Sequence, residues 1–340
     1  MSPIRVLVVD DSAFARKVLR ESLQTSAQVE VVGTARDGID ALEKIAQLQP
    51  DVITLDLVMP GLDGLGVLAA LSPEQRQRVV VVSMADGESD IGVAALSFGI
   101  FDLIHKPTAL AIASLLDIAE ELVSKVILAA AQPRARLPQA SSVRPLPTPR
   151  SPSERVVVIG TSTGGPQALT RLLKQLPADF PAPLAIVLHI PEGYTGPLAE
   201  RLNSECAIEV AEAADGLLMR PGLAILAQAG KHLKFSPEGA AFGAQLDREP
   251  SQSLHRPSVD VMFESAAACF GKRVLGVVLT GMGDDGTLGA RAIVAAGGEV
   301  LTEAESSCVV YGMPRVVKEA GLSAAEAPLD GMAAAILARL

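Results

Sequence analysis

Short apolar runs alternate with amphipathic stretches along most of the chain. In the first part, the apolar runs occupy residues 4–9, 29–32, 52–55, 79–82 and 101–104, and helical patterns such as 13–25 and 109–128 separate them. Strands that alternate with helices at this spacing predict a parallel sheet covered by helices on both faces. The first 128 residues are therefore expected to form one α/β domain.

The same alternation returns from residue 154 onward. Apolar runs at 156–159, 184–190 and 274–279 predict further parallel strands. Between them, the pattern predicts a hairpin over 223–235 and a helix over 259–270. We therefore expect two doubly wound α/β domains, the second with an antiparallel hairpin excursion.

A change of composition separates the two halves. Residues 129–153 contain six prolines, four arginines and no acidic residue, so this stretch does not favour a helix or a central strand. We interpret it as a linker between a domain at 1–128 and a second domain at 154–340. A chain of 340 residues with 49% hydrophobic side chains has enough apolar material for two cores.

Composition also restricts the partners and the compartment. The net charge of −10 and the few aromatic residues argue against nucleic acid as the main partner. The apolar runs are much shorter than a membrane span requires, and the N-terminal residues lack the pattern of an export signal. Cys206, Cys269 and Cys308 are widely spaced and suggest neither disulfides nor a zinc site. We expect a cytoplasmic protein without membrane insertion.

Three carboxylates follow two of the predicted strands in the first half. Asp10 and Asp11 come directly after the first strand, and Asp56 comes directly after the third. Because parallel strands of such a fold place their functional residues at the carboxyl edge, the three side chains are expected to converge. Carboxylates that converge repel one another unless a cation is present, and oxygen ligands of this kind suit Mg²⁺. The sequence predicts a magnesium site there.

Two further polar residues end the neighbouring strands. Ser83 ends the fourth strand and Lys106 follows the fifth, so that a hydroxyl and an ammonium reach the same edge. Together with a metal ion they could hold the oxygens of a transferring phosphoryl group, a reaction in which catalysis is mostly positioning and charge compensation.

In this order, the motifs DD, DLVMPGLDG, S and KP resemble the receiver domain of two-component response regulators over about 125 residues. The resemblance implies a flavodoxin-like sheet and a phosphoacceptor at Asp56. It further implies that Mg²⁺ is bound by Asp11, Asp56 and the carbonyl group of Val58, with help from Asp10.

The same resemblance assigns the remaining receiver residues. Ser83 would be the switch hydroxyl, and Lys106 would contact the phosphoryl group. Receivers usually have an aromatic residue three positions before this lysine, where the present chain has Leu103.

A glycine-rich turn follows the first predicted strand of the second half. The sequence IGTSTGG places glycines on both sides of Ser162, which permits a tight turn between strand and helix. The motif matches the G-x-S-x-G pattern of nucleophile elbows. Similar turns also bind phosphate groups through the start of the following helix, so the motif alone leaves both possibilities open.

A base and an acid are expected near this serine. His189 ends the run LAIVLHI, and the strand at 274–279 is followed by GMGDDG with Asp284 and Asp285. Three strand ends thus offer a hydroxyl, an imidazole and a carboxylate. In such a triad the histidine takes the serine proton and the acid orients the histidine and stabilises its charged form.

The stretches IGTSTGG, HIPEGYT, HRPSVDVMF and LTGMGDDG together resemble the chemotaxis-type protein-glutamate methylesterase (CheB) family over nearly the whole chain. The resemblance implies a Rossmann-like methylesterase domain with Ser162 as nucleophile, His189 as base, Asp285 as its acid partner and Met282 as a backbone contributor to the oxyanion hole. No cofactor would be needed for the ester hydrolysis.

The resemblance also implies the reaction and the partners. A phosphorylation-activated enzyme of this family would remove methyl esters from glutamate side chains on the cytoplasmic helices of chemoreceptors, and would deamidate certain glutamines there. A chemotaxis-type histidine kinase would supply the phosphoryl group. We expect a monomer.

Two other functions are compatible with parts of the pattern. An esterase that acts on small molecules could use the α/β-hydrolase order, with Ser162 followed by Asp215 and by His232 or His255. Alternatively, the GTSTGG turn could bind a nucleotide in a phosphate-accepting adaptor, although the chain lacks a Walker lysine and an acidic residue for the ribose at the usual positions.

Overall fold

The computed structural model describes residues 2–83, 89–106, 114–132, 153–238 and 241–340. The chain divides into two compact units, Met1–Gln139 and Ala140–Leu340, and we describe each by itself. The last helix of the first unit ends at Ala130, two residues inside the segment predicted as a linker. The part of that segment from 133 to 152 lies outside the described residues.

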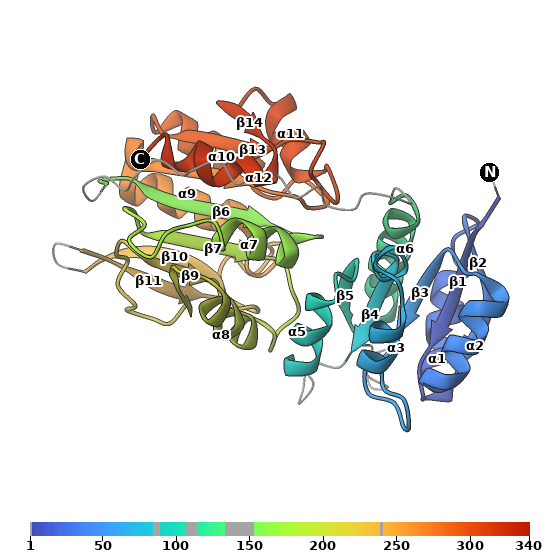
Figure 1. Cartoon of the computed structure of the whole chain (residues 1–340). Helices are drawn as coiled ribbons and strands as arrows, with labels where there is room; N and C mark the ends of the chain where they lie inside the picture. Colours follow the sequence, from blue (N-terminus) through green and yellow to red (C-terminus); the bar gives the residue numbers. More distant parts are fainter. Residues whose placement is uncertain (1, 84–88, 107–113, 133–152, 239–240) are drawn as a thin grey trace. The chain divides into compact units, whose positions relative to one another are not determined.

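The first unit contains a five-stranded sheet in the order β2-β1-β3-β4-β5 (Figure 1). Every neighbouring pair is parallel. This is the flavodoxin-like order, which confirms the predicted fold class. The strands are β1 (Ile4–Val9), β2 (Val29–Ala35), β3 (Val52–Leu55), β4 (Val79–Ser83) and β5 (Asp102–His105).

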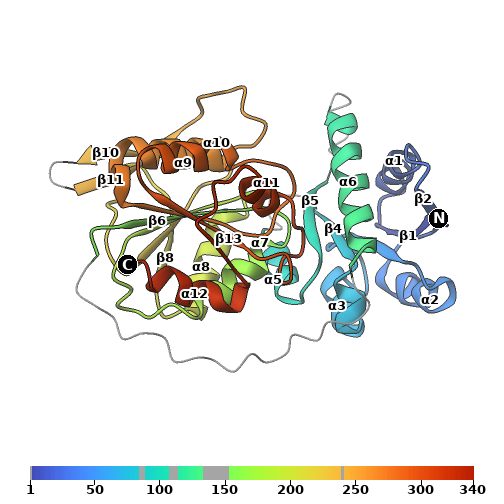
Figure 2. The same ribbon diagram turned by 90° about the horizontal axis from the view of Figure 1, so that it is seen from above.

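Helices cover both faces of this sheet. In the view of Figure 2, α1 and α6 lie on one face and α2, α3 and α5 on the other. All residues of β3 and β4 are buried, which explains why these strands are continuous apolar runs rather than alternating ones. The helices are α1 (Ala13–Leu23), α2 (Gly38–Leu48), α3 (Gly64–Ala70), α4 (Pro73–Arg76), α5 (Ser89–Ser97) and α6 (Ser114–Ala130).

The second unit is built around a seven-stranded sheet in the order β14-β13-β12-β6-β7-β9-β8. All six strand pairs are parallel. The strands are β6 (Val156–Thr161), β7 (Leu184–Leu188), β8 (Glu209–Glu212), β9 (Leu223–Leu226), β12 (Val274–Val278), β13 (Glu299–Glu303) and β14 (Ala325–Ala327). The predicted doubly wound architecture is confirmed for this unit as well.

This sheet is also covered on both faces. Figure 2 shows α9 and α10 on one face and α7, α8 and α12 on the other. The α9 face holds a cluster of buried apolar side chains that includes Val158, Phe263 and Ile293. The helices are α7 (Gly165–Leu173), α8 (Thr195–Glu205), α9 (Val259–Phe270), α10 (Thr287–Ala295), α11 (Met313–Glu319) and α12 (Leu329–Leu337), with a short 3₁₀ turn at Gly271–Arg273.

The antiparallel hairpin exists, but its predicted position was wrong. The run Leu223–Leu226 is β9, which pairs in parallel with β7 and β8. The hairpin instead joins β10 (His232–Glu238) to β11 (Ala241–Asp247). All four residues of β9 are buried, as is typical of a parallel strand between two helical layers, whereas a half-exposed hairpin strand alternates. None of the helices described is long and apolar enough to cross a membrane.

Candidate active site and phosphoacceptor site

Three adjacent strands in the middle of the second sheet lead to the predicted triad. Strand β6 lies between β7 and β12, and Ser162 directly follows it. His189 directly follows β7, and Asp285 lies in the turn between β12 and α10. Because the connections leave β6 toward one neighbour and return on its other side, this edge is a topological switch point, where open α/β sheets form their sites.

The serine turn is held by its backbone. The Ser162 amide donates to the carbonyl oxygen of Thr280 at 3.1 Å, and the Ser162 carbonyl accepts from the Gly165 amide at 2.7 Å. Gly164 has a φ of +79°, and a Cβ atom there would lie 2.6 Å from Cβ of Val309. Only glycine satisfies both the backbone conformation and the lack of space, so Gly164 serves the turn itself.

Asp285 is held by four hydrogen-bond donors. His189 Nε2 lies 2.8 Å from Oδ2, and the hydroxyl of Ser258 donates to Oδ1 at 3.0 Å. The amides of Val259 and Asp260 donate to the same carboxylate at 2.8 and 2.9 Å. These two amides form the start of α9, and a helix N-terminus stabilises a negative charge.

The electrostatic balance keeps Asp285 ionised. Burial would raise the pKa of this carboxyl, but the hydrogen bond and the charge interaction with His189, together with the amides of Asp260 and Val259, lower the pKa well below its usual value. The neighbouring Asp284, in contrast, is exposed. The structure thus brings Asp285 and not Asp284 to His189.

His189 faces Asp285 with Nε2, so Nδ1 is the ring nitrogen that is left to accept a proton. Nδ1 is buried, and no hydrogen bond from Ser162 or any other described residue reaches it. The imidazole stacks on His255, with ring centroids 4.0 Å apart and an angle of 24° between the planes. The His189 amide donates to the carbonyl oxygen of Thr161, which ties it to the residue before Ser162. Catalytic hydrogen bonds without substrate are often long, so this geometry is compatible with a base.

The turn after β12 packs directly against the serine. A Cβ atom on Gly281 would lie 3.0 Å from Cβ of Ser162 and 2.3 Å from the sulfur of Met313. Met282 follows at the surface, with 36% of its area exposed. Its backbone therefore lies beside the Ser162 turn, where the family resemblance predicts the oxyanion contribution.

The alternative hydrolase order is not supported by the geometry. His232 is fully buried; its Nε2 faces the carbonyl oxygen of Pro250 at 3.2 Å, and its Nδ1 accepts from the Ser258 amide at 3.2 Å. Burial lowers the pKa of His232, so the ring is neutral and both nitrogens are used by the backbone. Asp215 is exposed and accepts from the Leu246 amide. We therefore assign His232 to the scaffold.

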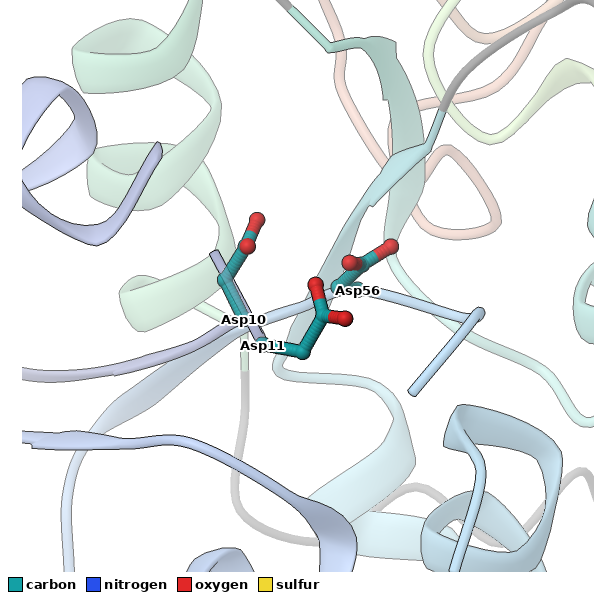
Figure 3. Close-up of side chains that lie close together, drawn as sticks. All are labelled: Asp10, Asp11 and Asp56. Atoms are coloured by element: carbon teal, nitrogen blue, oxygen red, sulfur yellow. The ribbon is translucent and has the colours of Figure 1, made fainter. Parts of the chain in front are cut away.

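The acidic residues of the first unit converge as predicted from the strand ends. Figure 3 shows Asp10, Asp11 and Asp56 close together, with carboxylate oxygens within 4.8 Å of one another. Lys106 Nζ lies 2.9 Å from Oδ2 of Asp10 and 2.7 Å from Oδ2 of Asp56. Burial raises the pKa of Asp56 to about 6, against the opposing effect of Lys106. A cluster of hard oxygen donors whose charge one lysine compensates only in part fits a divalent cation.

The other receiver positions surround this cluster. Ser83 is fully buried at the end of β4, and its carbonyl oxygen accepts from the Lys106 amide at 2.8 Å. Val58 is exposed, and its amide donates to Oδ1 of Asp56 at 3.4 Å. Leu103 is buried in β5, where its carbonyl oxygen accepts from Lys125 Nζ at 3.0 Å.

Both units match families of known proteins. Residues 157–336 match the family model described as CheB methylesterase, and residues 6–117 match the response regulator receiver domain. The chain belongs to the CheB methylesterase family. A protein-glutamate methylesterase/protein-glutamine glutaminase 5 from Myxococcus xanthus is 62% identical over 98% of this chain and 97% of its own length.

Further relatives extend this result. A protein-glutamate methylesterase/protein-glutamine glutaminase from Geobacillus kaustophilus is 43% identical over 99% of both chains. Among solved structures, the CheB methylesterase catalytic domain of Thermotoga maritima superimposes with a TM-score of 0.54 and 37% identity, over 55% of this CheB chain and 98% of that domain.

Two polar residues that support the site, Ser258 and Glu303, were not identified from the sequence. Ser258 donates to Asp285 and also caps α9, where its side chain accepts from the Val261 amide. A serine immediately before an apolar helical run is a recognisable helix start, so this signal was present. Glu303, at the end of β13, accepts from the Thr280 amide at 2.8 Å. No sequence pattern connects Glu303 with Thr280.

Proposed function

We propose that this CheB-family protein hydrolyses γ-glutamyl methyl esters of chemoreceptors and deamidates receptor glutamines, under the control of phosphorylation. The hydrogen bond between His189 and Asp285, one strand from Ser162, supports the hydrolytic half. The cluster of Asp10, Asp11 and Asp56 with Lys106 supports the regulatory half. The printed names of the relatives from Myxococcus xanthus and Geobacillus kaustophilus describe the same two activities.

Ser162 is proposed to attack the ester carbonyl carbon while His189 Nδ1 takes its proton. The negative charge that develops on the carbonyl oxygen would be stabilised by backbone amides near Met282, since donors aimed at a developing charge are a large catalytic term. The imidazolium would then protonate the departing methoxide, which leaves as methanol. A water molecule, deprotonated by His189, would release the glutamate from Ser162.

Asp285 is proposed to serve this cycle as an ionised carboxylate throughout. Its hydrogen bond from Nε2 keeps the basic lone pair of His189 on Nδ1, and its charge stabilises the imidazolium. The amides of α9 hold the carboxylate in place without being titrated. With a glutamine substrate the same steps would release ammonia in place of methanol.

Asp56 is proposed as the phosphoacceptor of the receiver unit. Asp10, Asp11 and Asp56, with the carbonyl group of Val58, would hold Mg²⁺, which compensates the charge of the phosphoryl group during transfer. Lys106 lies close enough to Asp56 to pair with a phosphoryl oxygen, and Ser83 would contribute its hydroxyl. A histidine kinase of the same sensory pathway is the proposed donor, the site of action is the cytoplasmic face of the receptors, and the chain is proposed to act as a monomer.

The deciding experiment measures methanol released from methylated receptor membranes by the full chain. We expect release to increase when a small phosphodonor and Mg²⁺ are added together. Asp56→Asn should remove this increase and leave the unstimulated rate. Ser162→Ala should lower both rates by orders of magnitude, because triad members act as a unit. Methanol release that persists in Ser162→Ala would contradict the proposed mechanism.

A further inference from the structure

A buried carboxyl group stands behind the active site without touching the triad. Glu303 ends β13, next to β12 in the sheet, and its exposed area is 0%. Its Oε2 accepts from the Thr280 amide at 2.8 Å, and its Oε1 lies 2.9 Å from the hydroxyl of Ser307. A fully buried carboxyl group is costly unless hydrogen bonds or charges compensate it, so its presence needs a reason.

Thr280, the partner of Glu303, joins the two turns of the active site. Its carbonyl oxygen accepts from the Ser162 amide at 3.1 Å and from the Thr161 hydroxyl at 2.7 Å. Its own hydroxyl donates to the carbonyl oxygen of Thr163 at 2.9 Å and accepts from the Val310 amide at 2.9 Å. The next two residues in the chain are Gly281 and Met282 of the proposed oxyanion turn. Any shift of Thr280 would therefore move the nucleophile and its oxyanion donors relative to each other.

We propose that Glu303 is a positioning residue of the esterase, and that it holds the Thr280 amide, and through it the serine and oxyanion turns, as a neutral carboxyl group. This inference rests on the proposed function, because the turns it positions belong to that reaction. Glu303 acts only through Thr280 and contacts neither of the two turns by itself.

The hydrogen bonds around Ser307 accommodate the neutral form. The Ser307 hydroxyl accepts from the Leu329 amide at 2.9 Å, and it lies 3.2 Å from the carbonyl oxygen of Ala304 and 2.9 Å from Oε1 of Glu303. One hydroxyl donates to one acceptor at a time. The Ala304 carbonyl also accepts from the amides of Ser307 and Cys308, so the assignment of a neutral Glu303 rests on its complete burial. If Glu303 carries a proton, it donates to Ser307, the hydroxyl donates to Ala304, and every group is satisfied.

The charges near Glu303 agree with this assignment. Among the described residues, the groups that face it are Arg171 of α7 and the Cys308 thiol, and neither forms an ion pair with it. Arg171 is paired with Asp330. Burial raises the pKa of Glu303 above its ordinary value of 4.5, against the hydrogen bonds from Thr280 and Ser307 and the charge of Arg171. Because the folded-state pKa is the higher one, the stabilising contribution is complete below about pH 4.5 and is lost as the pH rises through the folded value.

The test compares three variants of the full chain. Glu303→Gln reproduces the hydrogen-bond pattern of a protonated carboxyl, with an oxygen for Thr280 and an NH₂ group for Ser307. Glu303→Leu removes the acceptor for Thr280. Glu299→Gln is the matched control, because Glu299 starts the same strand and pairs instead with Arg155. The readouts are kcat and KM for methanol release, the rate at which a fluorophosphonate probe modifies Ser162, and the pH profile of both rates.

We expect Glu303→Gln to keep kcat within about threefold, and Glu303→Leu to lower kcat and the probe rate by roughly tenfold or more with KM little changed. Glu299→Gln should match the wild type. As the pH rises through the folded-state pKa of Glu303, the wild type should lose rate and thermal stability, and Glu303→Gln should lose less. A folded Glu303→Leu protein with the wild-type probe rate would overturn the positioning role.

Two other results would also count against the inference. If Glu303→Gln loses as much rate as Glu303→Leu, or loses rate with rising pH as the wild type does, the neutral form is wrong. If Glu303→Leu does not fold, the comparison of Glu303→Gln with the wild type across pH still decides that point. The fluorophosphonate probe separates this inference from the proposed function. A wild-type protein that reacts with the probe but releases no methanol would contradict the proposed substrate and not the positioning role of Glu303.

Discussion

Asp285 shares its carboxylate between His189, at 2.8 Å from Oδ2, and the first amides of α9. The histidine partner is thus fixed by a helix N-terminus and by the helix cap Ser258. This arrangement keeps the carboxyl group of Asp285 ionised and fixes its orientation toward His189. The following predictions test this geometry and that of the receiver site.

Replacing Ser258 by alanine removes one donor to Asp285 and the cap of α9. We expect kcat/KM to fall roughly 10- to 150-fold, because a hydrogen bond to a charged group contributes about 1.5–3 kcal/mol, and stability to fall by about 1 kcal/mol for the lost cap. Ester hydrolysis and thermal unfolding measure the two effects. Ser72→Ala, which removes the cap of α4 in the receiver unit, is the control that should leave kcat/KM of the phosphodonor-free enzyme intact. Equal kinetics for the two variants would contradict the role of Ser258.

Gly281→Ala should inactivate the esterase. The new methyl group would lie 2.3 Å from the sulfur of Met313 and 3.0 Å from Cβ of Ser162, so the turn has to move. We expect a loss of at least about 100-fold in kcat, since removal of one oxyanion donor costs that much. Gly196→Ala in α8 is the matched control, because a methyl group there meets Glu212 only at 3.5 Å. Methanol release by a folded Gly281→Ala protein at the wild-type rate would show that this turn does not serve the reaction.

His189 and His232 should respond differently to substitution. His189→Ala is expected to lower kcat by roughly 10³-fold or more, because the serine loses its base. His232→Asn keeps an acceptor near the position of Nδ1 and can still bind the Ser258 amide, so its activity should stay within about tenfold of the wild type. Single-turnover assays with a methyl ester substrate distinguish them. A larger loss for His232→Asn would favour the alternative hydrolase order.

The stability of the receiver unit should depend on pH through Asp56. Its folded pKa of about 6 exceeds the ordinary value of 3.8, so the protonated form is favoured in the folded state and stability is lost as the pH rises from about 4 through 6. In the presence of a chelator, Asp56→Asn should therefore be more stable than the wild type at pH 7, by up to about 3 kcal/mol, and similar to it at pH 4. Thermal unfolding at both pH values measures this. A stability difference that does not change with pH would contradict a raised pKa of Asp56 in the folded state.

The sequence pattern predicted the bounds of several elements that lead to the two sites with little error. Strands β1 and β3 and helix α9 have the predicted bounds, because the two strands are rich in Val, Ile and Leu and are followed directly by aspartates, and the helix follows the cap Ser258. Strand β9 was placed in a hairpin, since an apolar run of four residues does not by itself reveal whether one face or both are covered. The sheet order settles that question, and it depends on contacts between distant segments.

Site residues that closely follow strands could be predicted from the sequence. Contacts between residues of neighbouring strands could not. Ser162, His189 and Asp285 each come directly after or shortly after a strand, so convergence at the edge could be inferred. The contact of Glu303 with Thr280 depends on β13 lying beside β12 in a particular register, in which Val278 pairs with Thr302. No local pattern encodes that register.

The position of β6 between β7 and β12 affects how the activity develops during synthesis. The proposed nucleophile Ser162 is made first, but its proposed acid partner Asp285 follows more than a hundred residues later, after a strand that must insert on the opposite side of β6. Contacts of such separation form late and slowly during folding. A nascent or truncated chain that lacks β12 and the residues after it would carry Ser162 but neither Thr280, which holds its turn, nor Asp285. Esterase activity would then report that the entire catalytic unit, up to its distant strands, is assembled.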